Sequence, residues 1–301
     1  MNLTSAHLAA VSAFSLWGLF PLYWKIFPEV GAWDLFGHRL IWSFITVMLI
    51  LIFQKKLKNL KSIWHQKKVR YMLMLSALFI SSNWLIYIYA ISVGKVLEAS
   101  MGYFLNPLIN VLFGWFILKE NLRFTQWPAI FLALFSIVLM GIQTELSHFP
   151  WMAVVLSLTF ALYGIIRKTT HVGALEGLAF ETCFIVGPVL IYWLFQKSTP
   201  VTIYNELSLW KLTLLSLSGL ITCTPLILFA FSARRLKLQT IGFIQYLSPS
   251  LKFLCGLFVL NESLTSEKLQ AFVLIWIALG WYTIESFLFL KKQKKAIPIS
   301  E

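Results

Sequence analysis

Two similar stretches of the chain decide how its fold is interpreted. Residues 105–122 read LNPLINVLFGWFILKENL, and residues 247–264 read LSPSLKFLCGLFVLNESL. At an offset of 142 positions, 8 of the 18 aligned pairs are identical. Leucine matches are common in apolar sequence, but the match of Pro107 to Pro249 and of Glu120 to Glu262 in one register is not. The chain therefore contains an internal repeat.

The composition around the two stretches is that of an integral membrane protein. Of the 301 residues, 59% are hydrophobic and 12% are charged, and the mean hydropathy is +0.78. Soluble domains carry about 25% charged residues. A water-soluble protein of this length could not bury so much apolar surface, so we expect the surplus to face lipid. The composition argues against a soluble enzyme.

Ten apolar runs are long enough to be membrane spans, since a helix needs about 20 residues to cross the hydrocarbon core. They cover residues 6–25, 31–53, 71–94, 96–118, 125–144, 150–167, 174–196, 210–233, 238–260 and 266–290. The third and fourth runs are separated by the turn signal of Gly94. The sequence predicts an all-α integral membrane protein with ten transmembrane helices.

The positive charges predict the orientation of these helices. The loops on one side, together with the C-terminal tail, hold 18 lysines and arginines, whereas the loops on the other side hold 5. Cytoplasmic loops carry the excess of such residues, so both termini are predicted to be cytoplasmic, which requires an even number of spans. The same distribution accounts for the net charge of +13 and leaves no polar domain for nucleic acid.

The repeat unit is predicted to contain five helices and therefore to have inverted topology. Residues 1–145 form the first repeat, and residues 146–301 form the second repeat with a short basic tail. Because five is odd, the second copy enters the membrane from the opposite side. Inverted repeats are typical of secondary transporters, in which two near-equivalent halves can exchange conformations. A duplicated scaffold without transport is the alternative.

Ionisable side chains inside spans are candidate functional residues because they are costly in lipid. Arg39 and Lys252 are two such cations, Glu181 is a deep carboxylate, and Glu98 opens the fourth span near the outer face. Together they predict a cavity of net positive character, which favours an anionic or carboxylate-bearing substrate. Alternatively, Arg39 pairs with Glu98 or a backbone carbonyl, and Lys252 pairs with Glu181.

Pro107 and Pro249 occupy equivalent mid-span positions and predict matched helix breaks, which point to a midplane site. A packing kink is the alternative. The predicted substrate-binding residues are Arg39, Asn83, Trp84, Tyr103, Asn106, Asn110, Gln245, Tyr246 and Lys252. His38, Glu98 and Glu181 are candidates for proton coupling or gating, because histidine titrates near neutral pH. The alternative for His38 is a hydrogen-bonded packing role.

The sequence contains no Walker A loop and no catalytic motif such as G-x-S-x-G or H-E-x-x-H. Its three cysteines form no C-x-x-C pair. We therefore expect no enzyme activity, no cofactor and no bound metal. The expected partners are a small-molecule substrate, the lipid bilayer and protons as a coupling ion, and the protein is expected to be a monomer or homodimer.

Several motifs resemble the RarD proteins, which belong to the EamA group of the drug/metabolite transporter superfamily. They are Ser15-Leu-Trp-Gly-Leu-Phe-Pro-Leu-Tyr-Trp-Lys25, His38-Arg39-Leu-Ile-Trp42-Ser43, Asn83-Trp84, Leu97-Glu-Ala-Ser-Met-Gly-Tyr-Phe-Leu-Asn-Pro107 and Gly242-Phe-Ile-Gln-Tyr-Leu-Ser-Pro249. The resemblance covers nearly the whole chain and implies ten helices, two EamA repeats and a bacterial inner membrane. Lys252 departs from the family pattern of a polar uncharged or apolar residue.

These observations lead to one preferred function and two alternatives. The preferred function is secondary transport of small metabolites or drugs by alternating access. The alternatives are a translocator of lipids or lipid precursors, which should show a lateral opening between helices, and a non-transporting membrane receptor.

Overall fold

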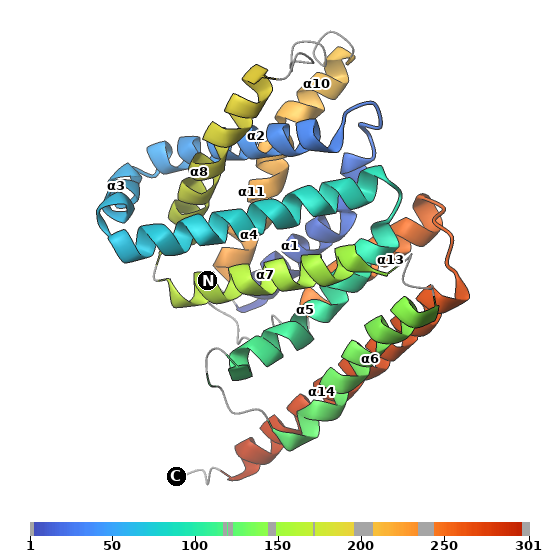
Figure 1. Cartoon of the computed structure of the whole chain (residues 1–301). Helices are drawn as coiled ribbons and strands as arrows, with labels where there is room; N and C mark the ends of the chain where they lie inside the picture. Colours follow the sequence, from blue (N-terminus) through green and yellow to red (C-terminus); the bar gives the residue numbers. More distant parts are fainter. Residues whose placement is uncertain are drawn as a thin grey trace.

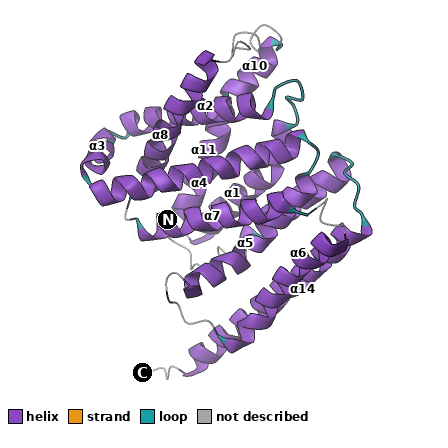
Figure 2. Ribbon diagram, in the orientation of Figure 1, coloured by secondary structure: helices purple, strands orange, loops and turns teal. Residues whose placement is uncertain are grey.

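In the computed structural model, the described residues are 3–116, 119, 123–143, 149–170, 172–195, 207–233 and 244–296. All regular secondary structure in these ranges is helical (Figure 2). The elements before residue 144 are α1 (Leu3–Trp24), α2 (Ala32–Phe53), α3 (Leu57–His65), α4 (Lys67–Ser92), α5 (Val96–Phe116), the 3-10 turn η1 (Phe124–Gln126) and α6 (Trp127–Gln143).

The elements after residue 148 are also helices, some long and some short (Figure 1). They are α7 (Trp151–Thr169), α8 (Ala174–Phe195), α10 (Leu209–Ser216), α11 (Ser218–Ala233), α13 (Leu247–Leu254), the π-helical turn η2 (Cys255–Val259) and α14 (Ser266–Ala296).

Six helical segments are long and apolar enough to cross a membrane. They cover Ser5–Trp24, Ala32–Phe53, Lys67–Ser92, Leu175–Phe195, Leu209–Phe229 and Ser266–Phe289. Six of the ten predicted spans coincide with them. The other four predicted runs contain α5, α6, α7, and α13 followed by η2. The all-helical membrane fold predicted from the sequence is confirmed.

Two details differ from the prediction. Helix α3 lies in the basic loop that follows the second span, where no helix was predicted, because its nine residues carry few apolar side chains. It contacts the rest of the fold through Ile63, which is buried, and Trp64, whose ring lies 5.0 Å from that of Phe180. Helix α14 also continues to Ala296, beyond the predicted end at residue 290, since lysine is compatible with helix.

The turn at Gly94 was predicted correctly. Helix α4 ends at Ser92 and α5 begins at Val96, and Gly94 between them has a φ of +69°. Glycine has no Cβ and adopts this left-handed conformation at little cost. The chain can therefore reverse between two adjacent spans within three residues.

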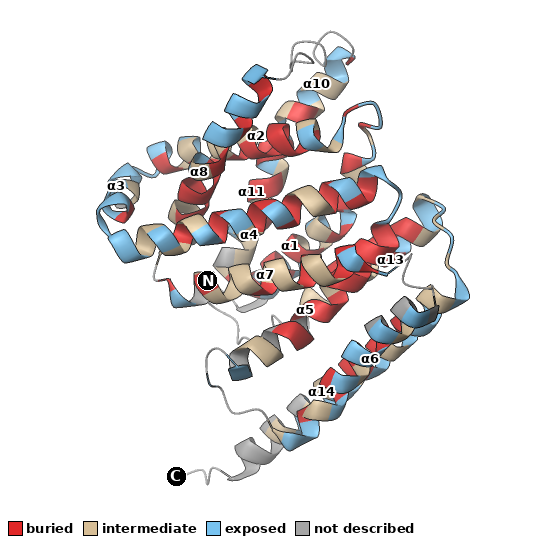
Figure 3. Cartoon of the chain, in the orientation of Figure 1, coloured by how far each residue is buried: buried red, intermediate tan, exposed pale blue. Residues whose placement is uncertain are grey.

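Helix packing brings the two halves of the chain together. Helix α7 packs on α4 and α5, α1 packs on α11 and α13, and α2 packs on α8 and α11. Helices α6 and α14 run side by side at one end of the molecule (Figure 1). Buried residues gather on the facing sides of α2, α8, α11, α5 and α13 (Figure 3). The buried polar side chains described next come from these helices and from α4.

Candidate functional site

Arg39 of α2 is a buried cation that pairs with no carboxylate in the part of the chain that the structure describes. Its side chain is 4% exposed, and its guanidinium carbon lies 4.3 Å from the centroid of the Trp84 ring and 5.5 Å from that of Trp24. No acidic side chain in the described ranges lies within 4.0 Å, and Nε and Nη1 have no hydrogen-bond partner there. Aromatic faces attract a cation but do not neutralise it.

Lys252 of α13 is a second buried cation held by aromatic rings. It is 4% exposed, and Nζ lies 3.5 Å from the centroid of the Tyr103 ring and 4.8 Å from that of Tyr87. The two tyrosine rings contact each other edge to face, with centroids 5.8 Å apart. The ammonium group is not paired with Glu181, so the alternative of a mutual Lys252–Glu181 pair is wrong.

The two cations share one set of neighbours. Tyr87 lies on α4 three residues after Trp84, so both rings project from the same face of that helix. The charge of Arg39 acts on Tyr87, Tyr103 and Lys252. We call this region the cation chamber and define it by Trp24, Arg39, Trp84, Tyr87, Tyr103 and Lys252.

Several buried polar atoms around the chamber have no hydrogen-bond partner among the described residues. They are Trp24 Nε1, Ser43 Oγ, Tyr87 OH and Asn106 Oδ1. Ser43 lies one helical turn after Arg39, and Asn106 lies one turn after Tyr103. Most buried polar atoms in proteins are hydrogen-bonded, so a cluster of unpartnered ones suits a polar ligand.

Asn83 is placed differently from the prediction that it binds substrate. Its Nδ2 donates hydrogen bonds to the Leu156 carbonyl (2.8 Å) and to Thr159 Oγ1 (3.0 Å), and its Oδ1 accepts one from the Tyr103 hydroxyl (3.1 Å). These bonds join α4, α5 and α7 and occupy the amide. Asn83 therefore orients Tyr103 against Lys252.

Pro249 follows a break between two helical segments: residues 244 and 245 are helical, Tyr246 forms a turn, and α13 begins at Leu247. It is buried in the first turn of α13, where the missing N–H costs little, and its carbonyl accepts a hydrogen bond from Ser100 Oγ (2.7 Å). The backbone of α5 is helical through position 107. The side chains of Pro107 and Asn110, two of the predicted site residues, lie outside the described residues.

Gln245 and Tyr246, which were also predicted to bind substrate, are partly buried. Tyr246 packs against the apolar cluster that α5 forms with α14, which includes Phe104 and Phe272. Its backbone carbonyl accepts hydrogen bonds from Ser250. The described contacts of Tyr246 therefore lie in this apolar cluster, and a substrate-binding role for Gln245 stays a prediction.

The three candidates for coupling or gating lie in three different places. His38 is buried, with its ring 5.1 Å from that of Trp193. Glu98 Oε1 accepts a hydrogen bond from the Met152 amide (3.0 Å) at the start of α7, so it does not pair with Arg39. Glu181 contacts Ser76 and Arg167.

A second carboxylate binds a helix start in the same region. The Glu262 carboxylate accepts hydrogen bonds from the Val96 amide (2.7 Å) and the Leu97 amide (2.9 Å), at the start of α5. Glu98 stands in the first turn of that same helix and binds the start of α7. We call Glu98 and Glu262 the carboxylate latch, since each joins one half of the chain to the other.

Replacing Glu262 by alanine is expected to destabilise the protein, because two buried amides would lose their acceptor. The expected cost is about 2 kcal/mol, or roughly 5 °C in the thermal unfolding midpoint in detergent. Glu262→Gln keeps one acceptor and should lie between alanine and wild type. Glu267→Ala, at a partly exposed position in the first turn of α14, is the control; equal midpoints for Glu262→Ala and Glu267→Ala would contradict this role.

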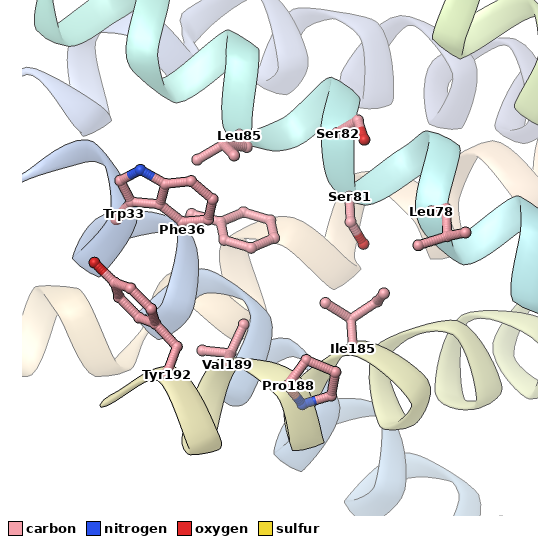
Figure 4. Close-up of a pocket in the computed structure, with 10 residues that line it drawn as sticks. All are labelled: Trp33, Phe36, Leu78, Ser81, Ser82, Leu85, Ile185, Pro188, Val189 and Tyr192. Carbon is pink, nitrogen blue, oxygen red and sulfur yellow. The ribbon is translucent and has the colours of Figure 1, made fainter. Parts of the chain in front are cut away.

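A separate apolar groove lies between α2, α4 and α8 (Figure 4). Its volume is about 240 Å³, and it is lined by Trp33, Phe36, Leu78, Ser81, Ser82, Leu85, Ile185, Pro188, Val189 and Tyr192. Trp33, Leu78 and Tyr192 are exposed, so the groove opens to the outer surface of the helix bundle. Phe36 precedes Arg39 by one turn, and Ser81 precedes Trp84 by one turn. One helical turn along α2 and α4 therefore separates the groove from the cation chamber.

Of the predicted substrate-binding residues, the structure brings together Arg39, Trp84, Tyr103 and Lys252. Sequence analysis missed Trp24 and Tyr87. The helical spacing of Tyr87 from Trp84 was a usable signal, because residues three apart share a face. No local pattern marks Trp24, which reaches Arg39 only through the packing of α1 near α2.

Comparisons with known proteins agree on one family. The model of the EamA-like transporter family matches residues 4–142. An uncharacterized transporter of Vibrio cholerae is 38% identical over 280 residues, which cover 92% of this chain and 91% of that protein. Protein RarD of Escherichia coli K12 is 34% identical over 292 residues, which cover 96% of this chain and 97% of that protein. A solved crystal structure shares the fold, with a TM-score of 0.63 at 19% identity, over 93% of this chain and 98% of that one.

Proposed function

Since this chain belongs to the EamA transporter family and is a homologue of the RarD proteins, we propose that it is a secondary transporter of a small anionic or carboxylate-bearing solute. The solute binds in the cation chamber, and the two halves of the chain exchange conformations to expose the chamber to either side of the membrane.

The observation that carries this proposal is the pair of buried cations without carboxylates. A buried ion is costly unless another charge compensates it, and the cost is largest within a membrane. Among the described residues, Arg39 and Lys252 are compensated by the faces of aromatic rings and by no carboxylate. A carboxylate would accept hydrogen bonds from the guanidinium of Arg39 and offset the repulsion between the two cations. Binding an anion would therefore offset the unfavourable free energy of burying two positive charges close together.

Alternating access requires two units that move relative to each other. We propose that these units are two inverted repeats of five spans each, residues 1–145 and 146–301. In that arrangement α1 corresponds to α7, α4 to α11, and α5 to α13 with η2. The packing supports this correspondence: α7 packs on α4 and α5, and α1 packs on α11 and α13. The backbone supports it too, since Lys119 and Asn261, 142 positions apart, both have positive φ angles of 57° and 52°. Few residues other than glycine adopt such angles.

The carboxylate latch supports alternating access. Glu262, in the second repeat, binds the start of α5 in the first, and Glu98, in the first repeat, binds the start of α7 in the second. Opening the protein on that side requires both contacts to separate. The excess of lysine and arginine in the loops on the other side supports an orientation in which this side faces away from the cytoplasm and both termini are cytoplasmic, in a bacterial inner membrane.

A counterflow screen in proteoliposomes tests the proposed function. The panel contains amino acids, organic acids, neutral drugs and organic cations, each loaded on one side and traced from the other. Anions are expected to exchange in wild type and to lose exchange by at least about tenfold in Lys252→Met, which keeps the length of the side chain but removes its charge. Lys211→Met, at a partly buried cation that pairs with Glu29 away from the chamber, is the control. Exchange of cations alone would overturn the anionic assignment.

The lateral groove favours one alternative, a lipid translocator. It is apolar and open at the bundle surface, and its lining residue Phe36 lies one helical turn before Arg39, a cation that could hold a phosphate headgroup. Fluorescent phospholipids included in the same proteoliposomes separate the two functions. Lipid scrambling by wild type that Lys252→Met abolishes, without exchange of any water-soluble anion, would favour the translocator.

A further inference from the structure

A second buried polar cluster, distinct from the cation chamber, surrounds Glu181 of α8. This side chain is 1% exposed. Its Oε1 accepts a hydrogen bond from Ser76 Oγ of α4 (2.6 Å), and Arg167 Nη1 of α7 lies 3.7 Å from the same oxygen. Oε2 is buried and has no hydrogen-bond partner among the described residues. Three helices from both halves of the chain meet at one carboxyl group.

The ion pair of Glu181 with Arg167 is loose. At 3.7 Å it is too long for a hydrogen bond, and Arg167 Nη1 has no hydrogen-bond partner in the described ranges. Arg167 Nη2 instead donates a hydrogen bond to the Gly173 carbonyl (3.1 Å). The attraction within a buried ion pair offsets the cost of desolvating both ions only when their hydrogen-bond geometry is good, and the Glu181–Arg167 pair has no direct hydrogen bond. The carboxylate and a neutral carboxyl group are therefore close in free energy at this position.

Gly177 makes room for this arrangement. It lies one helical turn before Glu181 on α8, and a Cβ added there would lie 1.7 Å from Arg167 Nη1 and 2.4 Å from its Cζ. The guanidinium thus fills the space that the missing side chain leaves. The contact holds the end of α7 against α8 beside the carboxyl group.

We propose that Glu181 is the proton-binding site of this transporter and that its protonation releases Arg167. One proton from water adds to Oε2, and no other bond forms or breaks. The charge of the Glu181–Arg167 pair changes from zero to +1, and the attraction between α7 and α8 is lost. Because α7 and α8 also pack on α4, this change lets the two halves shift relative to each other.

The other elements packed around α8 contribute no further described charge at Glu181. Arg167 of α7 is the described charge that acts on Glu181, and the charge of Glu181 in turn acts on Tyr163 of α7. His38 of α2 lies beside Trp193, three turns further along α8. The cations of α3 (Lys58, Lys61 and His65) are exposed, and α11 carries no acidic or basic residue. Lys168 and His171 lie outside the described side chains.

An infrared titration of the purified protein tests proton binding without any knowledge of the substrate. Spectra of wild type in lipid nanodiscs, recorded from about pH 5 to about pH 9, should show a protonated-carboxyl band that disappears on deprotonation. Glu181→Gln should lose this band, whereas Glu29→Gln, in the loop before α2, should keep it. A wild-type titration identical to that of Glu181→Gln would overturn the proposal.

Two further variants keep the test decisive if Glu181→Gln does not fold. Ser76→Ala removes the hydroxyl that stabilises the carboxylate, and Gly177→Ala displaces the Arg167 cation. Each should move the titration to higher pH by about one unit while the band remains. Gly164→Ala, where an added Cβ meets nothing within 4 Å, is the control. Titrations unchanged in both variants would assign the band to another carboxyl group and overturn the proposal.

A flux measurement then connects the site to transport and depends on the proposed function. With a solute that wild type exchanges, an imposed pH gradient should drive accumulation of about tenfold per pH unit for one coupled proton. Glu181→Gln should lose this accumulation but retain equal exchange. If Glu181→Gln loses the protonated-carboxyl band but wild type exchanges no solute, Glu181 is still a proton-binding site, and the proposed transport function is wrong. Accumulation by Glu181→Gln at the wild-type level would overturn the coupling role.

Discussion

Arg39→Ala is expected to abolish exchange of the anionic solute while the protein still inserts and folds. The guanidinium supplies at least two hydrogen-bond donors, Nε and Nη1, that no described residue uses. Losing a buried charged contact costs about 2–5 kcal/mol, so binding should weaken by roughly 30-fold or more. Uptake in proteoliposomes measures the loss of exchange. The thermal unfolding midpoint of the same preparation shows whether the variant still folds.

The unfolding midpoint distinguishes a binding arginine from a structural one. Removing one member of a buried ion pair destabilises a protein, whereas Arg39 has no carboxylate to leave behind. The midpoint of Arg39→Ala should therefore stay within a few degrees of wild type, because the lost contact to Trp84 is offset by the removal of a buried charge that no described carboxylate neutralises.

Arg123 provides the contrasting control. Its Nε and Nη2 donate hydrogen bonds to the Glu285 carboxylate (2.8 and 2.7 Å), and these bonds raise the pKa of Arg123 above its ordinary value. Arg123→Ala should lower the midpoint and leave solute binding intact. The opposite result, a large loss of stability for Arg39→Ala with normal exchange, would remove Arg39 from the site.

Arg39→Lys refines the same prediction. Lysine keeps the charge but cannot stack flat on Trp84 or present a planar pair of donors to a carboxylate. Exchange should fall between the levels of wild type and Arg39→Ala. Full activity of Arg39→Lys would indicate that the chamber needs only positive charge.

The fold was largely predictable because its signals are local. Each long apolar run becomes a helix, and Gly94 marks the turn between α4 and α5 without reference to any other part of the chain. Helix α3 was missed for the same reason, since its stability depends on contacts of Ile63 and Trp64 with distant residues rather than on its own composition. The repeat was visible because Pro, Gly and Glu recur in one register.

The site was predictable in its residues but not in its contacts. The cost of a charge in a membrane identified Arg39, Lys252 and Glu181 from the sequence. Their partners could not be predicted, because each comes from a different helix. Lys252 contacts Tyr103 rather than Glu181, and Glu181 contacts Ser76, 105 positions away. Pairing charges by sign alone left a Lys252–Glu181 pair open as an alternative, because it did not consider that aromatic rings also bind cations.

Close approach between the two halves of the chain depends on glycine, and it yields the last prediction. Gly219 of α11 lies directly against α2, where an added Cβ would be 2.0 Å from the Trp42 carbonyl oxygen and 2.2 Å from its carbon. Gly102 of α5 and Gly18 of α1 approach Ala153 and Leu251 in the other half with comparable closeness. Small residues let membrane helices pack with their backbones in contact.

Gly219→Ala should therefore lower the thermal unfolding midpoint by roughly 5–10 °C, because the obstacle is a helix backbone that cannot move aside like a flexible side chain. It should also separate Cys223 from the Ser43 carbonyl, now 3.8 Å away, and so widen the wall of the chamber behind Arg39. Gly280→Ala in α14 is the matched control: an added Cβ there meets nothing within 4 Å, and alanine favours helix over glycine. If Gly219→Ala and Gly280→Ala unfold at the same temperature, α11 does not press on α2, and the close contact between the halves at this crossing is wrong.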